Sequence, residues 1–464
     1  MSQTPQIRRP PITARLQSLL GQALPEASRG RPGKIDSLWK FLIILAFAVI
    51  LGIPLYLGLS PVLVHFDRLV AVPGLHLVLG LSAVLLLGHT ALTFLFSLLY
   101  RPAVGPAGPG LPHITVIVPA FNEGPMVGVA LGSILLGDYP RDCLEILAID
   151  DGSTDDTWEC IQRVVRRQPT IVRAIRMPKN GGKKEALCEG FRQATGLLVV
   201  TVDSDSRLDP DALRKIVAPL LVDPRVAAVA GKVQVLNRYA NLLTRLLAIR
   251  FYLAFDLGRA AQSWFGAVLC CPGALTAYRR EAVMAVLPRW SAQTFLGEPC
   301  TIGEDRALTT WLLRTGHRAV YQSTAIVHTL VPTTYKGLVK MYLRWERGNL
   351  REALTMLPVL PTRWRREDRW WPTLDIVLEL GQFPLICLGL ALTTAHFLAV
   401  PRDLLSLAAT LALVALVQSL WTLRSERSTD FLYGIGYAFF AFLCLQWVIP
   451  YSLVTVRNGR WMTR

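Results

Sequence analysis

The chain has 464 residues, of which 52% are hydrophobic, and it carries a formal net charge of +16. This hydrophobic share is high for a soluble protein and predicts membrane-spanning segments. The basic residues concentrate beside apolar runs, which is typical of the positive-inside bias, so no nucleic-acid partner is expected. The eight cysteines show no C-x-x-C spacing and indicate reduced thiols in the cytosol, and the seven histidines do not cluster as zinc ligands do.

The first hundred residues predict a tail and two membrane helices. Residues 1–38 are rich in Pro, Gly, Ser and Arg and read as a basic cytoplasmic tail. Within residues 39–100, the runs 41–64 and 77–99 are each long enough to cross a bilayer. Because basic residues flank the outer ends of this pair, we expect the N-terminus and everything after Tyr100 to be cytoplasmic. Residues 101–112 form a Pro- and Gly-rich linker.

From His113 the pattern changes to short strands that alternate with helices. Strands are predicted at 114–119, 144–149 and 172–177, and helices at 126–136, 157–167 and 184–194. This alternation favours an α/β domain over residues 113–335, built from βαβ units into a doubly wound sheet.

Two of the predicted strands end in acidic clusters. One strand ends at Asp150 and Asp151, and the apolar run LLVVTVDSDS, at 197–206, ends at Asp203 and Asp205. In parallel sheets, ligands bind at the carboxyl ends of strands. Side chains two positions apart on a strand point the same way, so Asp203 and Asp205 are suited to a divalent cation and the phosphate that it bridges.

Charged residues at two predicted helix starts add to this edge. The stretch NGGKKEALCEG places Lys183 after glycines at a helix N-terminus, which is either a phosphate site or an ordinary glycine turn with solvated lysines. The stretch FLGEPCTIGEDRALTT places Glu304 and Asp305 at another helix start, where plain helix capping is the alternative.

Two amphipathic segments and three apolar runs complete the chain. Residues 237–265 predict a helix with a basic face that lies on the membrane surface or on the sheet domain, and 342–354 predict a membrane-surface helix within an interfacial region, 336–370. Between them the segment VLCCPGALTAYRR is a strand or a bend that turns at Pro272 and Gly273.

The apolar runs, at 374–400, 404–423 and 431–454, predict about three membrane helices within residues 371–456, followed by a basic tail at 457–464. Asp375 and Glu379 are expected at a solvated helix start. Three spans would leave the basic tail outside, against its charge. Either the first run, interrupted by Pro384, is interfacial or re-entrant, or the last run doubles back at Pro450, or the tail lies outside.

Six motifs occur in one order over about 240 residues. They are VPAFNE (118–123), IDDGSTD (149–155), GGKKEAL (181–187), VDSDS (202–206), GEDRALT (303–309) and LRW (343–345). In these motifs the chain resembles the processive, inverting family 2 glycosyltransferases, which include the cellulose, chitin and hyaluronan synthases and the rhizobial chitooligosaccharide synthases. The region around GEDRALT resembles the hyaluronan and chitin branch. The chain departs from the family at Met341, where Gln is expected, and at CCPGAL, where many relatives have Ser-Gly-Pro.

The resemblance implies a GT-A fold and a role for each acidic or basic motif residue. By this analogy Asp150 and Asp151 contact the uridine, and Lys183 contacts the nucleotide or donor sugar. Asp203 and Asp205 hold the donor with Mg²⁺ or Mn²⁺. The resemblance also implies that Asp305 is the base, with Glu304 as its neighbour. Arg344 would contact the diphosphate, and the Trp345 indole would stack on the acceptor sugar. Pro272 and Gly273 would form a turn on the acceptor side.

The function implied is a processive β-glycosyltransferase in the bacterial inner or plasma membrane, with its catalytic domain in the cytoplasm. It would polymerise sugar from a UDP-sugar, with UDP-N-acetylglucosamine favoured, and extrude the growing polysaccharide across the membrane. Three alternatives stay open. They are a non-processive transferase that adds a single sugar to a lipid, a cellulose- or alginate-type synthase with another donor, and a transport or scaffold protein with an inactive sugar-nucleotide domain. The linkage, the product length and the oligomeric state are not predicted.

Overall fold

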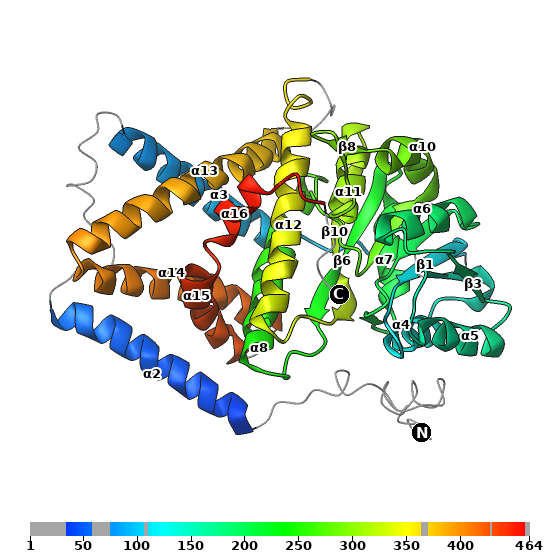
Figure 1. Cartoon of the computed structure of the whole chain (residues 1–464), viewed down its shortest axis with the longest axis horizontal. Helices are drawn as coiled ribbons and strands as arrows, with labels where there is room; N and C mark the ends of the chain where they lie inside the picture. Colours follow the sequence, from blue (N-terminus) through cyan, green and yellow to red (C-terminus); the bar gives the residue numbers. More distant parts are fainter. Residues whose placement is uncertain (1–33, 58–74, 106–109, 363–369, 427–428, 460–464) are drawn as a thin grey trace, which may run out of the picture.

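The computed structural model describes residues 34–57, 75–105, 110–362, 370–426 and 429–459. A mixed α/β domain lies beside a group of apolar helices, and two further helical segments lie between them (Figure 1). The predicted tail at 1–38 and the first predicted span, 41–64, are described only in part.

One eight-stranded sheet forms the centre of the α/β domain. Its strands run in the order β3-β2-β1-β4-β7-β6-β10-β5. The strands are β1 (Ile114–Ala120), β2 (Leu144–Asp150), β3 (Val172–Arg176), β4 (Leu198–Thr201), β5 (Arg207–Leu208), β6 (Val226–Val235), β7 (Thr276–Arg279) and β10 (Arg318–Thr329). A separate hairpin pairs β8 (Thr294–Phe295) with β9 (Glu298–Pro299).

The first four strands of this order are parallel neighbours, as the alternating pattern predicted. Strand β7 runs antiparallel to both β4 and β6, so the sheet is mixed. The sequence left β7 open as a strand or a bend, because a four-residue strand carries little periodicity.

Helices cover both faces of the sheet, and β1 shows why. Its seven residues are all buried; Val116 and Val118 join one core cluster while Ile117 joins the other. Successive strand side chains point to opposite faces, so an unbroken apolar run needs a cover on each side. One cluster includes α4 (Met126–Leu135), α5 (Thr157–Arg167) and α7 (Ala212–Val222), and the other includes α6 (Lys183–Gln193), α10 (Arg280–Ser291) and α11 (Glu304–Arg314).

The two amphipathic segments lie between the sheet domain and the apolar helices (Figure 1). The single helix expected at 237–265 is instead α8 (Leu242–Phe251), a π-helical turn (Tyr252–Leu257) and α9 (Gly258–Trp264). It starts late because Asn241 forms a capping box with Thr244. Helix α12 (Tyr335–Met356) is longer than predicted and begins at the Thr334 cap.

The apolar helices are α2 (Lys34–Tyr56), α3 (Leu75–Leu99), α13 (Trp370–Ala399), α14 (Asp403–Glu426), α15 (Tyr433–Cys444) and α16 (Val448–Val454). Among the described residues, Ser37–Tyr56 and Trp370–Ala399 are long and apolar enough to cross a membrane. Thr429–Cys444 and Val448–Val454 pass the same test as a pair bent by 48°. Helix α13 continues unbroken through Pro384.

The chain after α16 returns to the sheet domain. The Arg457 guanidinium lies 3.1 Å from the Glu298 carboxylate in the β8–β9 hairpin, and the Thr301 hydroxyl donates to the Gly459 carbonyl. The last apolar run bends by 48° at residues 445–447, ahead of Pro450.

Asp375 and Glu379 do not form a solvated helix start, so that expectation is wrong. Their side chains are only 13% and 14% exposed, and each carboxylate has a charged or titratable partner on another helix. A carboxylate in an apolar setting is stable only when paired or hydrogen-bonded, and tertiary packing supplies those partners here.

The close packing of α6 against the sheet leads to a prediction about stability. A Cβ at Gly190 would lie 2.5 Å from Ile117 Cγ2 and 2.9 Å from Ile149 Cδ1. Because β-branched side chains are stiff, we expect Gly190→Ala to lower the free energy of unfolding by about 1–3 kcal/mol. The matched control is Gly258→Ala, where a Cβ meets nothing within 4 Å. Thermal unfolding in detergent should show a lower midpoint only for Gly190→Ala; equal midpoints would contradict this packing.

Candidate active site

The end of β2 carries Asp150 and Asp151, and both side chains are buried. Asp150 Oδ1 accepts from the Ser153 backbone N–H at 3.1 Å. The two oxygens of Asp151 accept from the backbone N–H groups of Gly181 and Gly182, each at 2.8 Å. Asp151 therefore fixes the glycine loop from which α6 starts.

Lys183, the first residue of α6, joins two of the predicted acidic motifs. Its Nζ lies 2.5 Å from Asp203 Oδ1 and 3.1 Å from Glu304 Oε1. Burial works to lower the pKa of Lys183, but the carboxylates of Asp203, Glu304 and Asp305 outweigh it and raise that pKa. The ammonium therefore stays charged and ties the end of β4 to the start of α11.

The turn at Pro272 and Gly273 lies against this ion-pair cluster. A Cβ at Gly273 would lie 2.4 Å from Lys183 Nζ and 2.9 Å from Asp203 Oδ1. The Gly273 backbone N–H also donates to Asp305 Oδ2 at 3.3 Å. A side chain at this position would therefore displace the Lys183 ammonium or the Asp203 carboxylate from its present place.

Glu304 and Asp305 are neighbours with opposite pKa shifts. Burial works to raise the pKa of Glu304, but Lys183 and Arg344 outweigh it and lower that pKa. Burial, followed by the Glu304 charge, raises the pKa of Asp305. Asp305 Oδ1 accepts from the Arg306 backbone N–H at 2.7 Å. Two adjacent carboxyl groups with pKa values pushed apart can divide ionic and proton-transfer roles between them.

Helix α12 brings Arg344 to the cluster, and the next residue, Trp345, packs among aromatic rings. The Arg344 guanidinium acts electrostatically on Glu304. The half-buried Trp345 ring lies in an aromatic group with centroid distances of 5.9 Å to Phe251, 5.8 Å to Phe255 and 5.7 Å to Tyr342. An indole held in this way can present its remaining face to a flat apolar partner.

Strand β4 ends at Thr201, so Asp203 and Asp205 lie in the turn beyond it, and the expectation that strand geometry points them the same way is wrong. Asp205 accepts from the Thr329 hydroxyl at 3.1 Å, at the end of β10. Within the described ranges, no group of three or more His, Cys, Asp or Glu side chains is arranged to hold a metal ion by itself. Two neighbouring carboxylates suit a cation such as Mg²⁺, which keeps waters and substrate phosphates among its ligands. The residues present therefore fit a cation that arrives with a phosphorylated substrate.

The structure thus gathers the Lys183, Asp203, Gly273, Glu304, Asp305 and Arg344 positions into one cluster, with Asp151 holding the adjoining loop. Sequence reasoning missed Arg306, whose backbone N–H binds Asp305, and Thr329 beside Asp205. Arg306 follows the two acids directly, and this adjacency could have drawn attention to it. Thr329 ends a strand 124 residues after Asp205 and carries no comparable signal.

Comparisons with known proteins agree with this geometry. Residues 112–348 match the family described as "Glycosyltransferase like family 2". An N-acetylglucosaminyltransferase of Rhizobium meliloti (strain 1021) is 34% identical over 401 residues, which are 83% of this chain and 90% of that protein. A hyaluronan synthase of Streptococcus pyogenes is 32% identical over 440 residues, 92% of this chain and 97% of that protein.

A solved structure shows the same fold. The mannosyltransferase PcManGT of Pyrobaculum calidifontis, in complex with GDP-Man and Mn²⁺, aligns with a TM-score of 0.53 at 23% identity and covers 81% of this chain and 98% of that one. The domain predicted from the alternating strands and helices is therefore a GT-A-like fold, as expected. With the family match and both relatives, this likeness leads to one conclusion: the chain is a glycosyltransferase and belongs to glycosyltransferase family 2.

Proposed function

We propose that this chain is a membrane-embedded, inverting and processive β-glycosyltransferase. It polymerises sugar from a UDP-sugar, with UDP-N-acetylglucosamine as donor in a hyaluronan- or chitin-type reaction. The observation that carries the proposal is that α12 contributes to two places. Its Arg344 lies beside Glu304, and its Tyr342 and Glu346 line a pocket among the apolar helices. The donor is supported by relatives named N-acetylglucosaminyltransferase and hyaluronan synthase.

Asp305 is the proposed base. Inversion in a single displacement requires one group to take the proton of the acceptor hydroxyl while the diphosphate leaves on the opposite face of the sugar. Asp305 has the raised pKa of the acidic pair, and it lies against the Gly273 turn proposed for the acceptor side. A carboxylate with a raised pKa is the better proton acceptor.

Donor binding is assigned to the basic and acidic groups around Lys183. Lys183 and Arg344 would contact the diphosphate and donor sugar, and Asp150 and Asp151 border the region proposed for the uridine. Asp203 and Asp205 would hold Mg²⁺ or Mn²⁺ with the donor. When bound, the cation supplies Lewis-acid neutralisation of charge on the departing diphosphate.

The proposed base gives a mutational prediction. Asp305→Asn cannot accept the proton, so kcat should fall by about 10²–10⁴-fold. Binding of UDP with Mn²⁺, measured by calorimetry, should stay close to that of the natural chain, because Lys183 and Asp203 are unchanged. The control is Asp211→Asn, an exposed carboxylate that pairs with Lys215 on the surface. Turnover by Asp305→Asn near the level of the control would refute the assignment.

Product analysis tests donor and processivity together. Detergent-purified protein with Mn²⁺ is given UDP-N-acetylglucosamine, UDP-glucuronate and UDP-glucose singly and in pairs, and UDP release and product size are measured. We expect sustained release and long product from UDP-N-acetylglucosamine, either alone or only with UDP-glucuronate. EDTA should abolish release and Mn²⁺ should restore it. Release from UDP-glucose alone would contradict the donor, and a single sugar on a lipid would contradict processivity.

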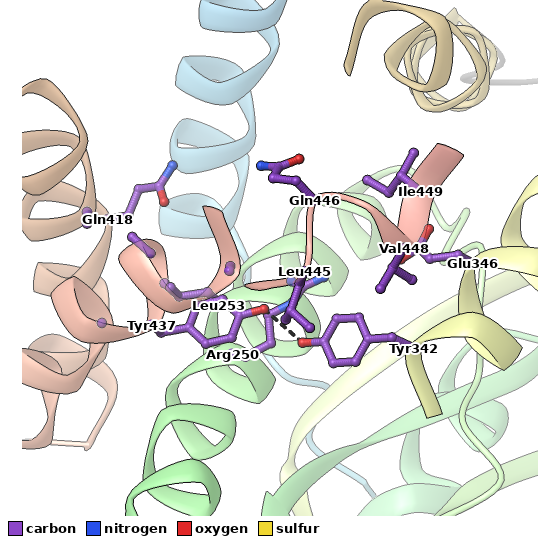
Figure 2. Close-up of a pocket in the computed structure, with 14 residues that line it drawn as sticks. Arg250, Leu253, Tyr342, Glu346, Gln418, Tyr437, Leu445, Gln446, Val448 and Ile449 are labelled. Atoms are coloured by element: carbon purple, nitrogen blue, oxygen red, sulfur yellow. Dashed lines mark hydrogen bonds between the residues drawn. The ribbon is translucent and has the colours of Figure 1, made fainter. Parts of the chain in front are cut away.

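Export of the product is the second part of the proposal. A pocket of about 290 Å³ lies among α8, the π-helical turn, α12, α14, α15 and α16. Figure 2 shows the Tyr342 and Tyr437 hydroxyls meeting within it, 2.8 Å apart, with Gln418 and Gln446 around the same space. Aromatic walls with dispersed polar groups suit a sugar chain, which has apolar C–H faces and hydroxyl edges. Because Tyr342 and Glu346 flank Trp345 on α12, this pocket supports an exit path from the acceptor site.

The export prediction uses inside-out membrane vesicles with donor supplied outside. We expect polymer to accumulate in the lumen, protected from an added glycosidase. Ala438→Trp, which fills the pocket, should shorten the product. Leu443→Trp is the matched control, since Leu443 lies on the same helix and is 73% exposed. Polymer found entirely outside the vesicles would rule out export by this chain.

A further inference from the structure

Two carboxylates on α13 lie one helical turn apart and enter separate buried networks. Asp375 contacts His89 of α3 at 2.9 Å and Gln262 of α9 at 2.6 Å. Glu379 instead receives a charge-assisted hydrogen bond from Arg306 Nη2 of α11 at 2.5 Å. Only Glu379 of this pair contacts the helix that begins with Glu304 and Asp305.

Arg306 connects three helices at the position next to Asp305. It is 8% exposed, its Nη1 donates to Asn349 of α12 at 3.2 Å, and its backbone N–H donates to Asp305 Oδ1. In a buried ion pair the loss of one partner leaves the other charge unpaired, so the surroundings rearrange around it. A substitution of Glu379 should therefore shift the turn that holds Asp305.

Contacts with the sheet domain also hold the start of α11. Lys183 pairs with Glu304, the Gly273 backbone N–H donates to Asp305 Oδ2, and the Trp290 indole N–H donates to the Glu304 carbonyl. Gly303, at the N-cap position, has φ +66° and no side chain with which to cap the first turn. Arg351 of α12 donates to the Ile302 carbonyl from one side. The Arg306 side chain holds the other side through Asn349 and Glu379.

We infer that Glu379 is a positioning residue for glycosyl transfer. By holding the Arg306 guanidinium, it sets the first turn of α11 so that the Asp305 carboxylate meets the acceptor hydroxyl. The inference rests on the proposed role of Asp305. It implies that catalysis in the sheet domain depends on how α13 packs against α11. Helix α13 is long and apolar enough to span the membrane.

The test compares Glu379→Gln with Asp375→Asn in purified full-length protein. A displacement of about 1 Å at a reacting group can cost about 10²-fold in rate. We expect Glu379→Gln to lower kcat by about 10- to 10²-fold, while KM for the donor and the affinity for UDP stay unchanged, because Lys183 and Asp203 keep their contacts. Asp375→Asn should leave kcat per folded molecule unchanged. Adding Glu379→Gln to Arg306→Gln should cause no further loss, since both remove the same ion pair.

The conservative variants separate positioning from folding. Glu379→Asp keeps the charge and should retain more kcat than Glu379→Gln, but less than Asp375→Glu. If Glu379→Gln does not accumulate as folded protein, the test is the comparison of kcat between Glu379→Asp and Asp375→Glu. Equal kcat values for the Glu379 and Asp375 variants, or a change confined to KM, would overturn the inference. Asp305→Asn, assayed alongside, distinguishes this result from a failure of the proposed function, which would appear as retained turnover in that variant.

Discussion

The Lys183 ammonium between the Asp203 and Glu304 carboxylates is the contact on which the candidate site depends. It joins the start of α6, the end of β4 and the start of α11, which are separated by up to 121 residues in the chain. Without this cation, three carboxyl groups would lie close together and repel one another. With it, Glu304 stays ionised and its charge helps to raise the pKa of Asp305. One ion-pair cluster therefore sets both the assembly and the protonation chemistry of the site.

Helix α12 extends this arrangement toward the membrane. Arg344 faces the ion-pair cluster, Trp345 packs among aromatic rings, and Tyr342 and Glu346 line the pocket in the apolar helices. Side chains two positions apart point to nearly opposite sides of a helix, so α12 has the ion-pair cluster on one side and the pocket on the other. The proposed coupling of transfer to export follows from this shared helix.

Buried polar contacts also connect the apolar helix α13 to α3, to α9 and to α11 of the sheet domain. Asp375 binds His89 and Gln262, and Glu379 binds Arg306. Unpaired charges are costly in a low-dielectric setting, so such pairs specify how the helices dock. Apolar packing alone is less specific, because many registers of an apolar face bury similar area. The Glu379–Arg306 pair thereby gives α13 a defined register relative to the first turn of α11.

The sequence by itself determined the α/β class, the strand that ends at Asp150, the strand that ends shortly before Asp203, and the amphipathic nature of 342–354. These features depend on local periodicity and on side chains adjacent in the chain. It left β7 undecided and treated 237–265 as one helix, because a four-residue strand and a π-helical turn have weak local signals. Only the tertiary structure decided that Lys183 meets Glu304 and that Glu379 meets Arg306. The physical reason is that a charged side chain finds its partner through the packing of distant elements, and local patterns in a sequence do not reveal which faces meet.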